Sequence, residues 1–206
     1  NSALDPNSDL SLNSNLTLNG IFTATAVSVA TQLGADIEGE ATGDQFGRSV
    51  SLSSDGSIVA IGASRNSENG NYSGHVQVYQ YSNSTWTQLG DDIDGENTYD
   101  WSGYSVSLSS DGSIVAIGAT RNSSSTGHVR VYKYDPIKTT AITDQNDSNY
   151  GPVGWNRLGQ DIDGEASSDE SGYSVSLSSN GEIVAIGARY NDGNGSNSGH
   201  VRVYQY

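Results

Sequence analysis

Three acidic segments recur along this 206-residue chain, each with carboxylates spaced in the same way around a glycine. The carboxylates stand at positions i, i+2, i+4 and i+8, where i is Asp36, Asp92 or Asp161. Oxygen ligands gathered by a flexible turn suit Ca²⁺, which takes about six to eight of them. The spacing therefore predicts calcium as the candidate cofactor, with these candidate ligands: Asp36, Glu38, Glu40, Asp44, Asp92, Asp94, Glu96, Asp100, Asp161, Asp163, Glu165 and Asp169. The alternative is that the carboxylates are solvated charges that discourage pairing at strand edges.

The other residues that could do chemistry are repeated rather than unique. The three histidines, His75, His128 and His200, each stand in a Gly-His-Val triplet. Equivalent positions in successive repeats favour a repeated structural hydrogen bond over a catalytic or zinc-binding role. The chain has no cysteine, and none of its serines stands in a G-x-S-x-G motif. We therefore expect no catalytic residues and no enzyme activity.

The elements that must position these groups are strands. Residues 49–63 and 105–119 both read SVSLSSDGSIVAIGA, and residues 174–188 differ from them at two positions. Apolar residues alternate with serine, and Asp55-Gly56 and its equivalents separate two such runs, which predicts hairpins with type I′ turns. A later HVxVYxY strand and a short tryptophan-containing strand complete four strands per repeat. This pattern predicts an all-β fold of three four-stranded antiparallel blades of β-propeller type.

The repeat frame also predicts the domain organisation. The three blade repeats are residues 32–81, 82–134 and 155–206, and residues 135–154 are a polar loop insertion. Closed propellers have about four to eight blades, so three blades belong to a longer chain, combine with blades of other chains, or stack openly. Residues 1–31 form an extended N-terminal arm of strand-like sequence, which pairs with an edge of its own blades or with another chain. For the second case we expect assembly through Leu10, Leu12, Leu16 and Leu18.

The strand pattern resembles the FG-GAP repeat of integrin α-subunit propellers. Phe46-Gly47, Ser49-Val50 and Gly62-Ala63 match its Phe-Gly pair, its Ser-Val strand and its Gly-Ala ending. The integrin-type calcium loop D-x-D-x-D-G-x-x-D is absent, and the short SSDGS hairpin takes its place. The WTQLGxDIDGE pattern resembles repetitive surface proteins of bacteria and marine microbial eukaryotes. The resemblance covers residues 32–206 and implies an extracellular or cell-surface location.

Composition narrows the possible partners. The net charge of −15 excludes nucleic acid and disfavours anionic membranes, and no apolar run reaches the roughly 20 residues of a membrane span. The chain begins with Asn1 and lacks methionine, so we expect a mature, secreted protein whose signal peptide has been removed. Six sequons could carry glycans, although a polar loop composition accounts for them slightly better: Asn15, Asn71, Asn83, Asn122, Asn146 and Asn194.

Two functional hypotheses follow. The first is a non-catalytic secreted or cell-surface structural or adhesive protein that self-assembles, with other copies of itself or other surface proteins as partners. The alternative is a lectin-like module that binds calcium or glycans through its blade loops.

Overall fold

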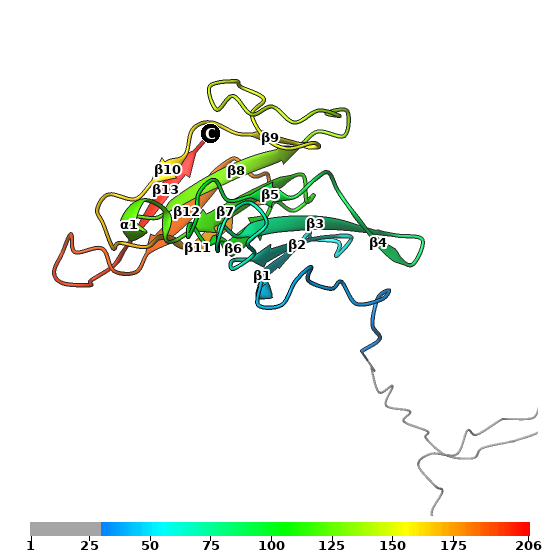
Figure 1. The fold of residues 1–206 in the computed structure, drawn as a ribbon, viewed down its shortest axis with the longest axis horizontal. Coiled ribbons are helices and arrows are strands. Elements are labelled where there is room, and N and C mark those ends of the chain that lie inside the picture. Colours follow the sequence, from blue (N-terminus) through cyan, green and yellow to red (C-terminus); the bar gives the residue numbers. More distant parts are fainter. Residues whose placement is uncertain (1–29) are drawn as a thin grey trace, which may run out of the picture. The chain divides into compact units, whose positions relative to one another are not determined.

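Three antiparallel sheets account for nearly all the regular structure of residues 30–206, which are the residues that the computed structural model describes. The four arm leucines and the sequon at Asn15 lie outside the described residues. The three sheets belong to one unit, Leu33–Tyr206 (Figure 1). The all-β prediction is confirmed for the described residues, whose one helical segment is α1 (Asn122–Ser125). Even α1 is irregular, because Ser123 and Ser124 have left-handed backbone angles.

The first two sheets share one strand order. In the first sheet β1 (Phe46–Leu52), β2 (Ile58–Ala63), β3 (His75–Ser82) and β4 (Thr85–Gln88) follow in sequence, and β5 (Ile93–Asp94) also pairs with β3. In the second sheet β6 (Ser102–Leu108), β7 (Ile114–Ala119) and β8 (His128–Tyr134) are adjacent, and both β9 (Trp155–Arg157) and β10 (Ile162–Asp163) pair with β8.

The third sheet contains three strands, β11 (Ser171–Leu177), β12 (Ile183–Ala188) and β13 (His200–Gln205). The prediction of four strands per sheet is therefore corrected to five, five and three. The short isoleucine-containing part of each acidic segment adds a fifth strand, because it runs along the beginning of β3 or β8. The tryptophan-containing strand that closes each of the first two sheets comes from the following repeat in the sequence.

The hairpins form at the predicted places, but their turns differ from the predicted type. Gly56 has a φ of +72°, as the left-handed region requires, whereas Asp55 does not have a positive φ, so the turn is not type I′. The Asp55 carboxylate instead accepts hydrogen bonds from Ser53 Oγ (2.7 Å) and Ser57 N (2.9 Å). These bonds close a longer turn, in which Gly56 N donates to Ser53 O.

The sheets pack face to face through two apolar cores. The first core joins the first sheet to the second and includes Val76, Val78, Ile93, Val115 and Trp155. The second core joins the other face of the second sheet to the third and includes Val129, Val131, Val184 and Ile186. Trp155 is 0% exposed. Its Nε1 donates to Leu89 O (2.9 Å), and this hydrogen bond fixes β9 beside the end of β4.

Polar contacts between the sheets repeat in register. Ser49 Oγ of β1 donates to Gly103 O of β6 (2.9 Å), and Ser105 Oγ of β6 donates to Gly172 O of β11 (2.7 Å). The first strands of successive sheets therefore lie beside one another, and the stack propagates by one contact pattern.

The insertion, residues 135–154, folds as a loop beside β9 (Figure 1). Lys138 Nζ holds its base by donating to Trp155 O (2.7 Å), and Ile142 pairs with Gly151 across it. Among the described residues, no helix is long and apolar enough to cross a membrane.

Candidate functional site

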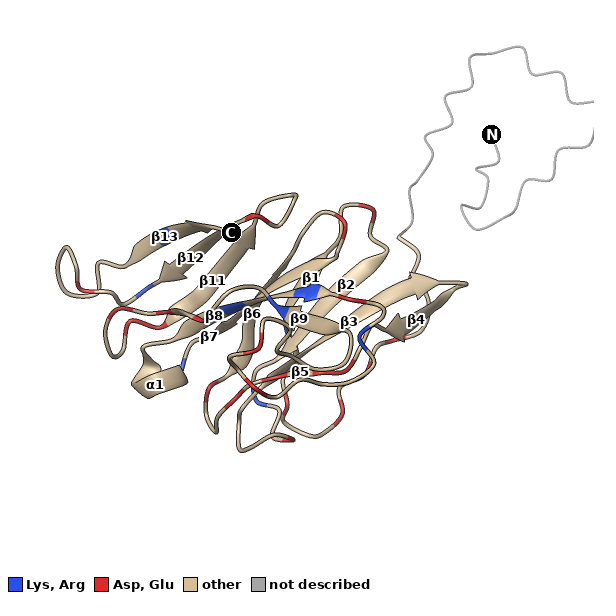
Figure 2. Ribbon diagram, turned by 90° about the horizontal axis from the view of Figure 1, so that it is seen from above, with Lys and Arg blue, Asp and Glu red and all other residues tan. Residues whose placement is uncertain are grey.

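Much of the acidic surface lies in the loops, including those around β5 (Figure 2). The structure does not gather the four carboxylates of one segment around a single point. It brings the third carboxylate of one segment close to the first carboxylate of the next, beside the histidine that opens β3 or β8. Glu40 and Asp92 meet at His75 in this way, and Glu96 and Asp161 meet near His128.

The last aspartate of each segment has a structural environment. Asp44, Asp100 and Asp169 are at most 6% exposed. Each accepts a hydrogen bond from the backbone N–H three residues earlier and another from the Nδ2 of a buried asparagine. These side chains therefore close the turn before each first strand.

The second sheet neutralises its carboxylates with the chain's own cations. The Arg130 guanidinium donates to both oxygens of Asp161 (3.0 and 2.9 Å), and it also forms an ion pair with Glu96. Arg157 Nη1 donates to Asp161 as well (2.8 Å). Burial lowers the pKa of the neighbouring His128, which favours its neutral form.

In the first sheet, glutamines replace both arginines. Gln77 stands where the second sheet has Arg130, and its Nε2 donates to Glu40 Oε1 (2.9 Å) and to Asp92 (3.1 Å). Gln88 stands in the place of Arg157 and donates to Asp92 Oδ1 (2.6 Å). The carboxylates thus keep hydrogen-bond donors, but they have lost the two positive charges.

A histidine and a further carboxylate complete this group. Ligand atoms of Glu40, Glu68, His75 and Asp92 all lie within 4.8 Å of one another. Sequence reasoning predicted Glu40 and Asp92, but it missed Glu68 and His75. The available signal was the replacement of two arginines by glutamines in one repeat, together with an acidic residue, Glu68, where the second repeat has a serine.

The electrostatic environment of this group is strongly negative. Loss of hydration, followed by the charges of Asp92, Glu68 and Glu40, raises the pKa of Asp94 to about 6. Loss of hydration and the nearby carboxylates also raise the pKa of Tyr79. The neutral Tyr79 hydroxyl donates to Gln77 Oε1 (2.8 Å), which turns the Gln77 amide nitrogen towards the carboxylates.

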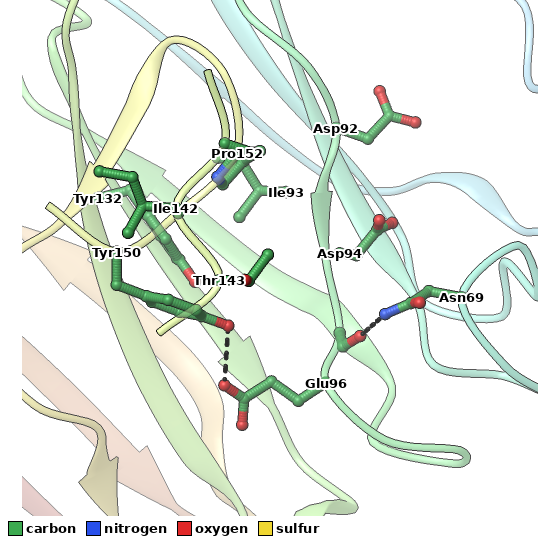
Figure 3. A pocket seen from close by; sticks show the side chains of 13 residues that line it. Asn69, Asp92, Ile93, Asp94, Glu96, Tyr132, Ile142, Thr143, Tyr150 and Pro152 are labelled. Atoms are coloured by element: carbon green, nitrogen blue, oxygen red, sulfur yellow. Dashed lines mark hydrogen bonds between the residues drawn. The ribbon is translucent and has the colours of Figure 1, made fainter. Parts of the chain in front are cut away.

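A separate cavity of about 210 Å³ opens between β5 and the insertion (Figure 3). Tyr132, Ile142, Tyr150 and Pro152 line one side, and acidic residues of the second segment line the other. The Tyr150 hydroxyl donates to Glu96 Oε1 (3.2 Å). Burial raises the pKa of Tyr132 to about 12, so the Tyr132 phenol is neutral at ordinary pH. Ligand sites for drug-sized molecules occupy about 300–1,000 Å³, so this cavity has room only for a smaller ligand.

The remaining predicted residues lie at the surface, with one exception. Asp36, Glu38, Asp163 and Glu165 are exposed, as are the sequons at Asn71, Asn83, Asn146 and Asn194. Asn122 is 8% exposed, and its Nδ2 donates to Asp100 (3.2 Å). A glycan would have to replace that buried hydrogen bond, so Asn122 is poorly placed to carry one.

These features define an all-β repeat protein in which antiparallel sheets of one sequence pattern stack in series. The FG-GAP repeat model matches two stretches of the chain, residues 38–79 and 162–204, in agreement with the sequence resemblance. The middle copy of the pattern lies between these two stretches. Comparison with curated proteins finds no match.

Comparison with solved structures matches parts of two larger chains. TolB from Acinetobacter baumannii is 17% identical, with a TM-score of 0.38 over 79% of this chain and 33% of TolB. Hydrazine synthase from Kuenenia stuttgartiensis is 14% identical, with a TM-score of 0.44 over 76% of this chain and 44% of the other. This chain therefore spans less than half the length of either structure.

Proposed function

We propose that this chain is a non-catalytic structural or adhesive scaffold whose sheets, as blades of β-propeller type, continue into those of a second copy. The observation that carries the proposal is the unequal burial of one hexapeptide. IVAIGA forms β2, β7 and β12. Five of its six residues are buried in β2 and β7, whereas Ile183, Ala185 and Gly187 of β12 remain accessible. The face of this strand that carries these three residues is therefore covered by a following sheet in the first two sheets and is uncovered in the third.

The two ends of the stack expose the two halves of one interface. Val201 and Val203 on β13 are 67% and 64% exposed, although the equivalent valines of β3 and β8 are at most 1% exposed. Val50 and Leu52 on β1 are 64% and 60% exposed, although their equivalents on β6 are at most 9% exposed. Because apolar burial drives association, the outer face of the third sheet is complementary to the outer face of the first.

The polar contacts support the same arrangement. Ser49 and Ser105 bridge successive sheets through the carbonyl of a glycine, and Ser174 holds the next place in that series. In a head-to-tail contact, Ser174 Oγ of one copy would donate to Gly47 O of the other. Residues 31–34 read TQLG, as do residues 87–90 around the end of β4, so this part of the second copy would supply the strand that closes the sheet beside β13.

Two copies joined in this way supply six sheets, which lies within the range of about four to eight blades found in closed propellers. A head-to-tail contact that closes after two copies forms a ring, and one that does not close forms a fibre. Secretion or cell-surface display, and adhesion to other surface proteins or glycans, are parts of the same proposal. FG-GAP repeats are typical of such proteins, which supports this location.

Sedimentation velocity over a range of protein concentrations tests the proposal. We expect reversible association, and we expect Val203→Asp or Leu52→Asp to raise the dissociation constant at least tenfold, about 1.4 kcal/mol. An equimolar mixture of the two variants should recover one intact interface and form a heterodimer. Ile137→Asp is the matched control, because Ile137 is 83% exposed but lies in the insertion. A monomer at every concentration, or association that neither face variant weakens, would overturn the proposal.

A second candidate function, a calcium- or carbohydrate-binding module, is favoured by the cavity beside β5. Its phenols and carboxylates offer both donors and acceptors to a sugar hydroxyl, and Tyr150 offers a ring face. Titration of monosaccharides into the ¹⁵N-labelled protein should then shift amides of residues 141–152, and Tyr150→Ala should abolish the shifts. Shifts that the Tyr150 variant retains, or no shifts at all, would contradict a sugar site in this cavity.

A further inference from the structure

One buried histidine nitrogen in the first sheet has no hydrogen-bond partner. His75 is 1% exposed, and its Nδ1 is buried without a donor or acceptor in place. A buried nitrogen that lacks a partner is costly, and native structures rarely tolerate one without a reason. Two carboxylate oxygens lie close to it, Asp92 Oδ2 at 3.4 Å and Glu40 Oε2 at 4.0 Å.

The two carboxylates are oriented so that one oxygen of each remains directed to His75. Gln77 holds Glu40 Oε1, which leaves Oε2 on the side of the histidine. Gln88 holds Asp92 Oδ1, and Oδ2, which lies 3.4 Å from Nδ1, accepts one hydrogen bond from Gln77 Nε2 (3.2 Å) and keeps a second lone pair. Outer hydrogen bonds that fix ligand orientation in this way are characteristic of metal sites.

The distances suit a small divalent ion. Zinc bonds of about 2.0–2.2 Å in tetrahedral geometry place neighbouring ligand atoms about 3.3 Å apart. His75 Nδ1 and Asp92 Oδ2, the less exposed pair, already have that separation at 3.4 Å. Glu40 and Glu68 are exposed, and their flexible side chains can close the remaining gaps, since all four ligand atoms lie within 4.8 Å of one another.

The second sheet shows what occupies the equivalent space when no metal is needed. There Arg130 and Arg157 bring two positive charges to Glu96 and Asp161. The first sheet has three carboxylates, from Glu40, Glu68 and Asp92, and glutamines in place of both arginines. Among the described residues no Lys or Arg forms an ion pair with these three carboxylates, so a bound cation would supply the charge that the arginines supply in the second sheet.

We infer that Glu40, Glu68, His75 and Asp92 form a binding site for a divalent transition-metal ion, best fitted by Zn²⁺. The imidazole nitrogen selects against Ca²⁺, which prefers oxygen ligands alone, and carboxylate and imidazole together suit Zn²⁺. The ligands come from the segment before β1, the β2–β3 loop, β3 and the segment before β5, so the ion would tie these four parts together. This inference does not depend on the proposed association between copies.

Titration calorimetry of the whole chain with Zn²⁺ tests the inference. We expect one saturable site per chain, and at least tenfold weaker binding after Glu40→Gln or Glu68→Gln, which change exposed side chains and leave the core intact. Glu165→Gln is the matched control, because it changes the equivalent glutamate of the third segment. The double variant Gln77→Arg, Gln88→Arg copies the charge compensation of the second sheet and should abolish binding.

A spectroscopic measurement identifies the ligand atom. On addition of Zn²⁺, the Nδ1 resonance of His75 should shift in ¹⁵N-detected imidazole spectra, while those of His128 and His200 stay in place. Ca²⁺ should bind at least tenfold more weakly than Zn²⁺. The inference is overturned if no saturable Zn²⁺ binding occurs, if the Glu40 and Glu68 variants bind like the control, or if Ca²⁺ binds as tightly without shifting His75.

Discussion

Replacing Gly118 by alanine would test how closely the stacked sheets approach. Gly118 lies on β7, and a Cβ at this position would stand 2.2 Å from Gly172 O on the next sheet and 2.4 Å from Ser105 Oγ. Neither distance is compatible with van der Waals contact, so the two sheets must separate by roughly 1 Å. The hydrogen bond from Ser105 Oγ to Gly172 O, 2.7 Å long, would then be lost.

The magnitude follows from three contributions. Overpacking costs about 1–3 kcal/mol, and the lost hydrogen bond costs about 1 kcal/mol. The smaller conformational entropy of alanine in the unfolded chain offsets about 0.5–1 kcal/mol. We therefore expect Gly118→Ala to lower the free energy of unfolding by about 1–3 kcal/mol, which corresponds to a fall in Tm of about 2–12 °C.

Gly187 provides the control within the same molecule. It holds the equivalent place on β12, but the atoms near its added Cβ all belong to Ser174 of its own sheet, the closest being Oγ at 2.5 Å. That hydroxyl can rotate away, so Gly187→Ala should change the free energy of unfolding of the dilute monomer by less than about 0.5 kcal/mol. Urea unfolding followed by tryptophan fluorescence measures both variants. Equal destabilisation of the two, or a neutral Gly118→Ala, would refute the close approach of the sheets.

Three further predictions concern the turns, the buried aspartates and the end faces. Hydrogen bonds from Ser53 and Ser57 lower the pKa of Asp55 to about 2. Their stabilising contribution to the fold is therefore complete above about pH 3.9, the pKa of an unfolded aspartate, and disappears as the pH falls through 2. An NMR titration of the Asp55 carboxyl with a midpoint of about 3.9 would contradict this turn geometry. Asp100→Ala removes the acceptor of the Asn122 hydrogen bond, so we expect urea unfolding to show a free energy of unfolding lower by about 1–3 kcal/mol. Asp163→Ala, at the surface, should change this free energy by less than about 0.5 kcal/mol. Equal losses in the two variants would argue against the structural role of Asp100. Gly187→Ala should abolish association in sedimentation velocity without destabilising the monomer, because its Cβ would meet the incoming Gly47 carbonyl; unchanged association would exclude the proposed stacking.

The regular part of the fold could be predicted because the signal is local and repeated. Alternating apolar residues fix the strands of each repeat, and the glycine of each Asp-Gly or Asn-Gly pair fixes the hairpin. The turn type could not be predicted from Asp-Gly alone, since Ser53 and Ser57 compete for the Asp55 carboxylate and favour a longer turn. The strand β5 was also missed. A two-residue strand such as Ile93–Asp94 depends on pairing with His75 and Val76, which the sequence does not show.

The candidate metal group was predicted only in part for a similar reason. Spacing within one acidic segment suggested that its four carboxylates converge, but the turn before β6 buries Asp100 against Asn122 instead. Convergence occurs between segments, because β5 brings Asp92 to the beginning of β3, where Glu40 arrives from the preceding segment. Such a contact depends on strand pairing within the first sheet, which spacing along the chain does not report.

The repeats show how function can diverge on a conserved scaffold. Positions that hold the sheets together, such as Gly62 and Gly118, keep their identity, because any side chain there would meet the backbone of the next sheet. Positions around the histidine are free of that constraint, and there Gln77 and Gln88 stand in place of arginines. Two substitutions thus separate a sheet whose carboxylates are neutralised by its own guanidinium groups from one whose carboxylates need a cation from solution. The difference between the two sheets is therefore one of charge, imposed on the same backbone.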